Sequence, residues 1–200
     1  MPTASLRERQ SELARRAIFD VLVRHLEAGD ADDVPMEELA AEAGISRRTL
    51  YRYFATRAEL LEAAAPWIRD EVLQLPIEIG DEGIVESFHK AATRLAAKPR
   101  LARALLHSCV GRTLRSGYRS ARVEAIRRAL KRECPGLSSR ELTRASAVLG
   151  HLCSSNAWIT IQDESGLDAA SAHAAVEWAI ETLLAQLRGR THSPSKGRRR

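Results

Sequence analysis

Apolar residues recur at helical spacing along most of this 200-residue chain. The pattern is clearest over residues 168–188, where Ala172, Val176, Ile180 and Leu184 return every fourth position and would share one face of a helix. No segment shows the sustained alternation of apolar and polar residues, rich in β-branched side chains, that is typical of half-buried strands. The sequence therefore predicts an all-α fold.

Helix start and stop signals divide the chain into about nine helices. Capping boxes mark two starts, one at Ser5 and one at Thr56, and Gly44 can supply the left-handed turn that ends a short helix. Pro66 should kink or break the helix that contains it. The expected helices cover about residues 5–28, 35–43, 47–54, a segment from 57 that includes Pro66, 83–97, 100–115, 119–133, 138–161 and 168–188.

Composition is that of an ordinary globular protein. Hydrophobic residues make up 44% and charged residues 28% of the chain. The opening MPTASLRERQ is not followed by the apolar region of a signal peptide, and no apolar run reaches the roughly 18 residues that a membrane span needs. We therefore expect a cytoplasmic protein with no membrane partner.

Cysteines and histidines form no recognisable metal or disulfide pattern. Cys109, Cys134 and Cys153 are odd in number and widely spaced, which favours buried thiols over disulfides. His107 and His151 have no second ligand at a spacing such as His-x-x-x-His. There is also no Ser-His-Asp motif, Gly-rich phosphate loop or pair of carboxylates in an apolar setting. The sequence predicts no metal, cofactor or catalytic residue, which leaves a helical enzyme of unrecognised chemistry as one alternative.

The segment GISRRTLYRYFATR, residues 44–57, contains four arginines and no acidic residue. On a helical wheel of about 100° per residue, Leu50 and Phe54 fall on one side. Arg48 and Arg52 fall on the opposite side. This distribution predicts a helix with one buried side and one strongly basic side.

A short helix held by a preceding helix and a tight glycine turn is the helix-turn-helix arrangement, whose second helix enters a major groove. Arginine forks can read guanine edges, and hydroxyl groups such as those of Thr49 and Tyr51 suit phosphate oxygens. The alternative is a surface helix with solvated arginines. The acid-free stretch, the turn at Gly44 and the capped helix from Thr56 occur together, which favours double-stranded DNA as the partner.

The segment AAEAGISRRTLYRYFATRAEL resembles the N-terminal motif of TetR-family transcriptional regulators. The resemblance covers about residues 12–62, and the closing helix GLDAASAHAAVEWAIETLLAQL resembles that of many members. Positions that match the motif are Ala40, Gly44, Leu50, Tyr51, Tyr53, Phe54 and Arg57. One departure lies at Val34 and Pro35, where many members open the second helix with a phosphate-contacting threonine.

The resemblance implies the organisation of the chain and its DNA contacts. It implies a helix-turn-helix DNA-binding domain over residues 5–62 and a C-terminal helical ligand-binding and dimerisation domain over residues 63–188. Base contacts are implied for the positions of Arg47, Arg48 and Arg52, with Thr49 reaching base or backbone, and phosphate contacts for Tyr51, Tyr53 and Arg57.

The resemblance also implies a dimer, more often a repressor than an activator, that binds a palindromic operator and is released by a small-molecule effector. The helices at about 138–161 and 168–188 would form the homodimer interface; the alternative is that their stripes are intramolecular core. Small-ligand pockets combine apolar walls with a few polar groups. Candidate effector-binding residues are Trp67, Phe88, Leu105, Cys109, Leu152, Asn156 and Trp158. For each of them the alternative is a core position, and Asn156 could also bond within the dimer interface.

Positive charge is concentrated at the C-terminus. Six of the basic residues lie from Arg188 onward, so that the net charge of +5 leaves 5 − 6 = −1 for the rest of the chain. Residues 189–200 are expected to form a basic disordered tail, either solubilising or an auxiliary DNA arm. A helical interaction protein of the same fold without specific DNA binding is the second alternative function.

Overall fold

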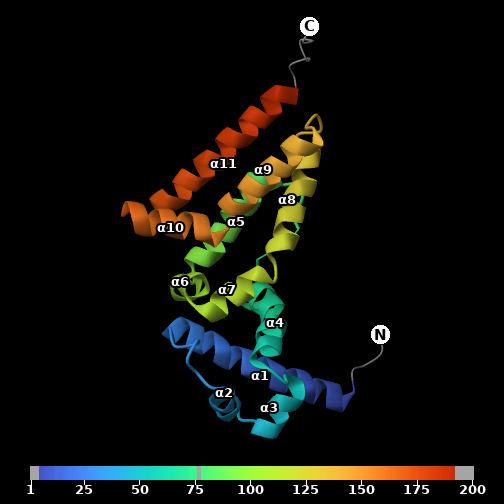
Figure 1. Cartoon of the computed structure of the whole chain (residues 1–200), viewed down its shortest axis with the longest axis vertical. Coiled ribbons are helices and arrows are strands. Elements are labelled where there is room, and N and C mark those ends of the chain that lie inside the picture. Colours follow the sequence, from blue (N-terminus) through green and yellow to red (C-terminus); the bar gives the residue numbers. More distant parts are fainter. Residues whose placement is uncertain (1–4, 76–77, 192–200) are drawn as a thin grey trace. The chain divides into compact units, whose positions relative to one another are not determined.

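The computed structural model describes residues 5–75 and 78–191 (Figure 1). These residues form eleven α-helices and one π-helix and contain no strand, which confirms the predicted all-α class. None of the described helices is both long and apolar enough to cross a membrane. The chain divides into two compact units. The first holds the described residues up to Gln74 together with Lys98–Tyr118, and the second holds Leu75–Ala97 and the described residues from Arg119 onward.

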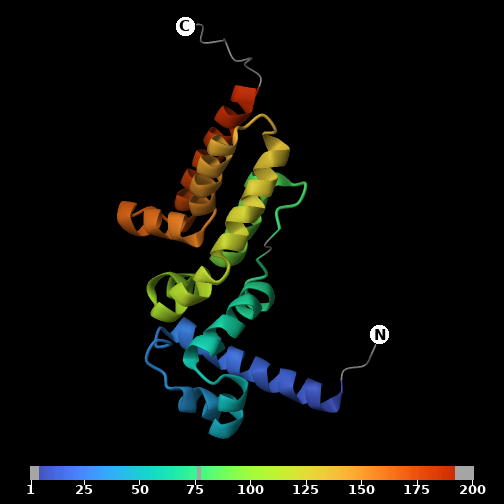
Figure 2. The ribbon, with the colours of Figure 1, turned by 45° about the vertical axis from the view of Figure 1, so that its right-hand side comes forward.

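The first unit is built around α1. Its elements are α1 (Leu6–Ala28), α2 (Met36–Glu42), α3 (Arg47–Tyr53), α4 (Arg57–Trp67), the π-helix η1 (Ile68–Val72), α6 (Pro99–His107) and α7 (Cys109–Ser116). The predicted capping box opens α1, because Ser5 Oγ accepts the Glu8 N–H and Glu8 accepts the Ser5 N–H. Figures 1 and 2 show α1 between α2 and α3 on one side and α6 and α7 on the other. The helix-turn-helix and the α6–α7 pair therefore share one support.

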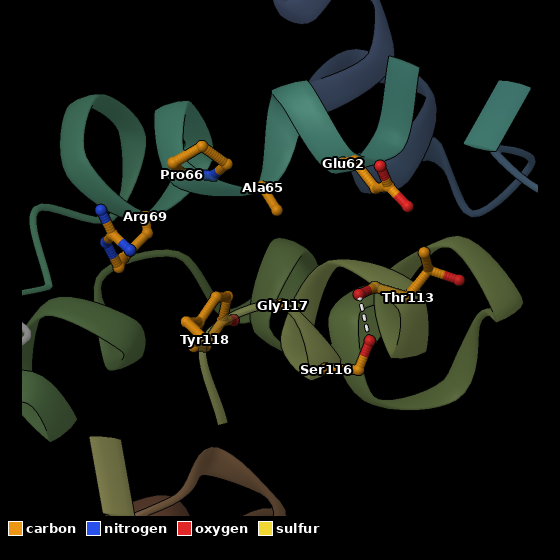
Figure 3. A pocket seen from close by; sticks show the side chains of 8 residues that line it. All are labelled: Glu62, Ala65, Pro66, Arg69, Thr113, Ser116, Gly117 and Tyr118. Atoms are coloured by element: carbon orange, nitrogen blue, oxygen red, sulfur yellow. Dashed lines mark hydrogen bonds between the residues drawn. The ribbon is translucent and has the colours of Figure 1, made fainter. Parts of the chain in front are cut away.

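The expected break at Pro66 takes the form of a change of helix type. Pro66 lacks an N–H group, so the carbonyl of Glu62 loses its usual partner four residues on. One residue later α4 ends at Trp67, and the chain continues as the wider π-helix η1. Pro66 and Ala65 lie on the part of α4 that faces α7 (Figure 3).

The second unit is a smaller set of helices with its own core. Its elements are α5 (Gly83–Ala96), α8 (Arg119–Glu133), α9 (Ser139–Leu152), α10 (Ser155–Ser165) and α11 (Ala169–Thr191). Apolar side chains from all five helices are buried, among them Phe88, Ile126, Leu149, Trp158 and Ile180. The Glu133 carboxylate accepts the N–H of Ile84 at 3.1 Å and pairs with Arg188, so it ties α8 to the start of α5 and the end of α11.

Two helices that the sequence predicts as continuous are interrupted. The segment 100–115 divides into α6 and α7 at Ser108, and 138–161 divides into α9 and α10 at Cys153 and Ser154. Ser108 has an extended backbone with φ −83° and ψ 157°. Its Oγ donates to the Ala104 carbonyl at 2.7 Å and accepts the Gly111 N–H at 2.8 Å. One serine therefore closes α6 and caps α7. With the two breaks, the expected nine or so helices become eleven α-helices over the described ranges.

The compact units differ from the predicted domains. The boundary between residues 62 and 63 falls inside α4, and α6 and α7 belong to the first unit rather than the second. Compactness does not test which part binds DNA or an effector, so the functional division remains a prediction. Helix α11 continues to Thr191, three residues into the predicted tail of 189–200, and residues 192–200 lie outside the described ranges.

Candidate nucleic-acid interface

Helix α3 begins at a tight turn that the local sequence dictates. Gly44 has a left-handed φ of 68°, a conformation in which any other residue would be strained. The next residue, Ile45, donates its N–H to the Ala40 carbonyl at 3.0 Å. Ser46 then caps α3, because its Oγ accepts the Thr49 N–H at 3.1 Å. The turn fixes how α3 leaves α2.

The inner side of α3 is anchored by aromatic packing. Leu50 is buried, and Phe54 is only 1% exposed. The ring centroid of Phe54 lies 5.8 Å from that of Phe19 in α1, and Phe19 lies 5.5 Å from the ring of Trp67 in α4. The Arg15 guanidinium stands 5.3 Å from the centre of the Phe54 ring. These contacts hold the end of α3 against α1 and, through Phe19, α4.

The outer side of α3 presents three arginines. Arg47, Arg48 and Arg52 are exposed, with 71% of the Arg47 side chain accessible. The Arg47 guanidinium lies 5.6 Å from the centre of the Tyr51 ring, and that of Arg52 lies 5.2 Å from the centre of the Tyr53 ring. Guanidinium groups over aromatic faces are attracted by the ring quadrupole. The guanidinium groups of Arg47 and Arg52 are therefore partly oriented by the neighbouring tyrosine rings.

A carboxylate on α2 contacts two of the predicted DNA-binding residues. Glu37 Oε1 accepts the Tyr51 hydroxyl at 3.1 Å and pairs with Arg47 at 3.1 Å. The pKa of Glu37 is lowered, first by its own backbone N–H and then by the Tyr51 hydroxyl. Glu37 therefore occupies the kind of position that a phosphate oxygen could take.

The remaining hydroxyl-bearing candidates are held by neighbours. Thr49 Oγ1 lies 2.8 Å from Ser46 Oγ, at hydrogen-bond distance. Tyr53 is half-buried, and hydrogen bonds first with Ser11 and then with Arg52 lower the pKa of Tyr53. Both residues lie on α3 beside the arginines, as the sequence predicts for a DNA-facing helix.

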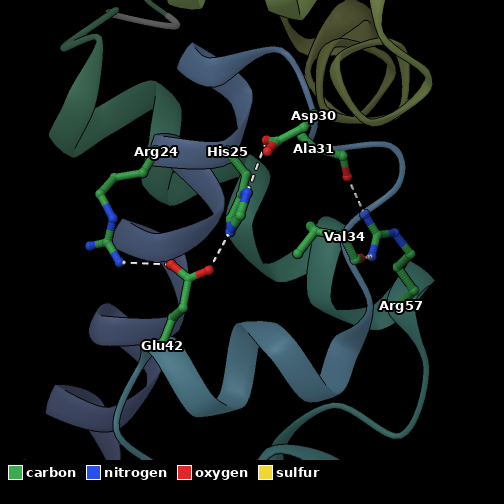
Figure 4. Close-up of polar contacts among 7 residues, drawn as sticks. All are labelled: Arg24, His25, Asp30, Ala31, Val34, Glu42 and Arg57. Carbon is green, nitrogen blue, oxygen red and sulfur yellow. Dashed lines mark hydrogen bonds and ion pairs between the residues drawn. The ribbon is translucent and has the colours of Figure 1, made fainter.

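Arg57 is turned toward the protein. Its guanidinium donates to the Val34 carbonyl at 2.6 Å and to the Ala31 carbonyl, both in the loop between α1 and α2 (Figure 4). Pro35 follows as the N-cap of α2 and makes no side-chain cap. Arg57 thus holds the loop that leads into the helix-turn-helix, and the phosphate contact implied for it remains a prediction.

His25 forms a polar cluster that the sequence analysis did not anticipate (Figure 4). Its Nδ1 lies 2.9 Å from Asp30 Oδ1, and its Nε2 lies 2.9 Å from Glu42 Oε1. The other carboxylate oxygen of Glu42 pairs with Arg24. A neutral imidazole carries one N–H, so both contacts are hydrogen bonds only in the imidazolium form. Burial lowers the pKa of His25, but the hydrogen bonds with Asp30 and Glu42 outweigh it and the net shift is upward.

This cluster predicts a pH-dependent stability. Because the folded pKa of His25 is raised above the ordinary 6.5, its contribution is complete below 6.5 and is lost as the pH rises through the folded pKa. We expect His25→Gln to lower the free energy of unfolding at pH 5.5 and to have a smaller effect at pH 9. Urea denaturation at several pH values measures this difference. The exposed His151→Gln is the control, and a His25→Gln effect independent of pH would contradict the imidazolium cluster.

The predicted effector-binding residues are spread over both units. Trp67, Leu105 and Cys109 lie in the first unit, and Phe88, Leu152, Asn156 and Trp158 lie in the second. Leu105, Phe88 and Trp158 are buried, whereas Cys109 is exposed at the start of α7. Trp158 packs edge-on against His173 with ring centroids 4.2 Å apart. Several of these side chains therefore have packing roles, and their part in effector binding remains a prediction.

A surface pocket of about 490 Å³ lies within the first unit, between α4 and α7. None of the predicted effector residues lines it. Its lining comes from Glu62, Ala65, Pro66, Arg69, Thr113, Ser116, Gly117 and Tyr118 (Figure 3). Over the described ranges, no group of three or more His, Cys, Asp or Glu side chains is placed to hold a metal ion.

Comparison with known proteins identifies the N-terminal region. Residues 18–64, which include the whole helix-turn-helix, match the family described as bacterial regulatory proteins, tetR family. Over these residues the chain is similar to regulators of the TetR family. An uncharacterized HTH-type transcriptional regulator of Mycobacterium tuberculosis is 39% identical to this chain over 74 residues, which are 37% of this chain and 35% of that relative. The nucleoid occlusion factor SlmA of Shewanella frigidimarina is 34% identical over 68 residues, 34% of each chain.

The chain thus matches about a third of the length of these curated relatives. Solved structures extend the similarity of fold to most of the chain. A tetR-family transcriptional regulator from Streptomyces coelicolor has a TM-score of 0.57 at 18% identity, covering 91% of this chain and 92% of that one. Mycobacterium smegmatis BioQ has a TM-score of 0.52 at 20% identity, covering 86% and 96%. The predicted resemblance is confirmed, and the helical fold after the helix-turn-helix is that of these structures.

Proposed function

We propose that this chain is a sequence-specific DNA-binding transcriptional regulator whose helix α3 enters a major groove. The main support for this proposal is that α3 has one buried apolar side and one exposed basic side. Leu50 is buried on one side, while Arg48 and Arg52 are exposed on the other and Arg47 is exposed in the first turn, in a stretch without an acidic residue. The family match over residues 18–64 contains all of α2 and α3 and supports this assignment.

Base recognition is assigned to the arginines. Arg48 and Arg52 are four residues apart, so they follow one another along the same face of α3. An arginine fork can bind guanine O6 and N7 together, which is the commonest specific base contact. Arg47 lies beside them, and its pairing with Glu37 would be exchanged for a contact with DNA.

Backbone contacts are assigned to hydroxyl groups. Thr49, Tyr51 and Tyr53 project from the same helix, and hydroxyls are common phosphate ligands. A phosphate oxygen would replace the Glu37 carboxylate that accepts the Tyr51 hydroxyl in the absence of DNA. Arg57 supports the interface by holding the loop before α2.

We propose that the second unit forms the homodimer interface, through α9, α10 and α11. Trp178 on α11 is 69% exposed and Val148 on α9 is 51% exposed, so both helices present apolar side chains to solvent. Burying such side chains against a second copy would favour association. A two-fold dimer would read half-sites about 34–36 Å apart and would need a palindromic operator.

The proposal includes repression that a small-molecule effector relieves, as the family resemblance implies. Effector binding and operator binding would then weaken each other by the same factor. Of the residues proposed to contact the effector, Asn156 and Leu152 are half-buried and Cys109 is exposed, which leaves their side chains accessible to a ligand.

Selection of duplexes from random DNA at near-physiological salt tests the proposed function. The parent chain is compared with Arg48→Ala plus Arg52→Ala. The matched control is Arg127→Ala plus Lys131→Ala, which removes two positive charges four residues apart on α8. We expect the parent and the control to enrich one palindrome and the Arg48/Arg52 variant to bind it roughly tenfold more weakly per lost arginine.

Two results would contradict the proposal. The first is equal binding of the selected duplex by the parent and the Arg48/Arg52 variant. The second is an absence of enrichment, with affinity that depends on salt but not on sequence, since phosphate neutralisation alone gives that behaviour. The second result would favour an interaction protein of the same fold.

A further inference from the structure

The loop between α1 and α2 is tied to α7 by a single carboxylate. Asp32 Oδ2 accepts the Cys109 N–H at 2.7 Å, and Asp32 Oδ1 accepts the Val110 N–H at 2.8 Å. These two N–H groups belong to the first turn of α7, where backbone donors lack partners within the helix. Hydrogen bonds first from Val110 and then from Cys109 lower the pKa of Asp32, so the carboxylate is ionised at neutral pH. The contact spans 77 residues of sequence.

The loop is short and leads directly to the DNA-facing helices. It runs from Gly29 to Pro35, and Pro35 is the N-cap of α2. The tight turn at Gly44 then fixes α3 against α2. Movement of the loop would therefore be passed to α2 and α3 as a pair, since no flexible segment separates them.

Helix α7 cannot move independently of α6. A Cβ placed on Gly111 of α7 would come within 2.4 Å of Leu105 Cα and 2.5 Å of the Ala104 carbonyl oxygen, both backbone atoms of α6. The two helices are thus in backbone contact at this point. The C-terminal end of α7 carries Thr113 and Ser116 and is followed by Gly117, and all three line the pocket beside α4.

We propose that Asp32 is a positioning residue that couples α7 to the helix-turn-helix, so that displacement of α7 from the pocket side shifts the α1–α2 loop and with it α3. The expected effect on DNA binding rests on the proposed function, whereas the coupling between α7 and the α1–α2 loop does not. Arg57 restrains the same loop from α4 through the Ala31 and Val34 carbonyls. The loop is therefore held between the two helices that line the pocket, and a change in their separation would act on it from both sides.

The test uses a substitution that fills the pocket in place of an unidentified ligand. Ser116→Trp adds an indole on the pocket side of α7, and Ser116→Leu is a smaller filler if the first variant loses helical content. Each is made in the parent chain, in Asp32→Asn and in Asp33→Asn. Asp33 is the adjacent exposed aspartate, so its substitution makes the same change of charge without touching α7.

Amide hydrogen exchange measures the coupling without DNA. The N–H groups of Asp33 and Val34 donate to the Asp30 carbonyl at 3.0 and 3.3 Å and report on the loop. We expect the filler to increase their exchange rates about fivefold or more in the parent and in Asp33→Asn, within the range typical of coupled sites. In Asp32→Asn the filler should change them much less, because Arg57 then remains as the tie between the loop and α4. A filler effect of equal size in Asp32→Asn, or no effect in the parent, would overturn the proposal.

Affinity for the selected duplex is the second measurement. The filler should weaken binding by a similar factor in the parent and in Asp33→Asn, and by much less in Asp32→Asn. If the effect of the filler on amide exchange requires Asp32 but no duplex is ever enriched, the coupling stands and the DNA-binding proposal fails. If duplex binding is specific but the filler acts equally with and without Asp32, the coupling proposal fails alone.

Discussion

Replacing Phe54 by alanine is expected to lower the free energy of unfolding of the first unit by about 3–5 kcal/mol, the range for large aromatic residues in a core. The ring is nearly inaccessible, packs 5.8 Å from Phe19 and lies beneath the Arg15 guanidinium. Its loss would leave a cavity at the end of α3. Urea denaturation followed by circular dichroism measures the change.

Phe54→Leu separates the loss of volume from the loss of the ring. It should cost less than Phe54→Ala, because a leucine fills more of the cavity. A loss under about 1 kcal/mol for Phe54→Ala would mean that α3 is not anchored by this ring. We also expect Phe54→Ala to weaken DNA binding because α3 becomes disordered, whereas Arg48→Ala with Arg52→Ala should weaken it without changing stability.

Gly111→Ala is expected to destabilise the first unit by about 3 kcal/mol or more, at or above the upper end for overpacked sites. A methyl group there would meet the Leu105 Cα at 2.4 Å and the carbonyl oxygens of Ala104 and Leu105 at 2.5 Å. These are backbone atoms, which cannot rotate away as a side chain can. The α6–α7 pair would have to separate, and the capping of α7 by Ser108 would be disturbed.

Gly189→Ala, in the second unit, is the control for adding a methyl group to a helical glycine. Gly189 also lies in a helix, but a Cβ there has no atom within 4 Å. In open surroundings alanine is favoured over glycine, by about 0.5–1 kcal/mol in the middle of a helix and by less in the last turn, where Gly189 lies. The two substitutions should therefore change the midpoint of denaturation in opposite directions. Similar small effects at both positions would contradict a backbone contact between α7 and α6 at Gly111.

Local signals were sufficient to predict most helices of the chain. The capping box at Ser5 and the turn at Gly44 depend on residues within a few positions of each other, and both are present. The breaks at Ser108 and Ser154 were missed because each serine lies inside a run with helical periodicity and no glycine or proline marks the interruption. At Ser108 the break also depends on the close approach of Gly111 to α6, which is a tertiary contact.

The polar ties around the loop between α1 and α2 could not be predicted from sequence. His25 meets Glu42 17 residues away, Arg57 meets Ala31 26 residues away, and Asp32 meets Cys109 77 residues away. No local pattern marks such pairs. For the effector-binding candidates the difficulty was different, because apolar residues such as Phe88 and Trp158 look the same in a sequence whether they line a pocket or fill a core.

The outer side of α3 is chemically separate from the residues that hold the helix in place. Leu50 and Phe54 anchor α3, while the exposed Arg48 and Arg52 project away from that packing. Exposed substitutions away from special contacts usually change stability by less than about 0.5 kcal/mol. If α3 reads DNA as proposed, substitutions at these outer positions would change the preferred DNA sequence without loss of the fold. Relatives with the same fold would then need few substitutions to bind different target sites.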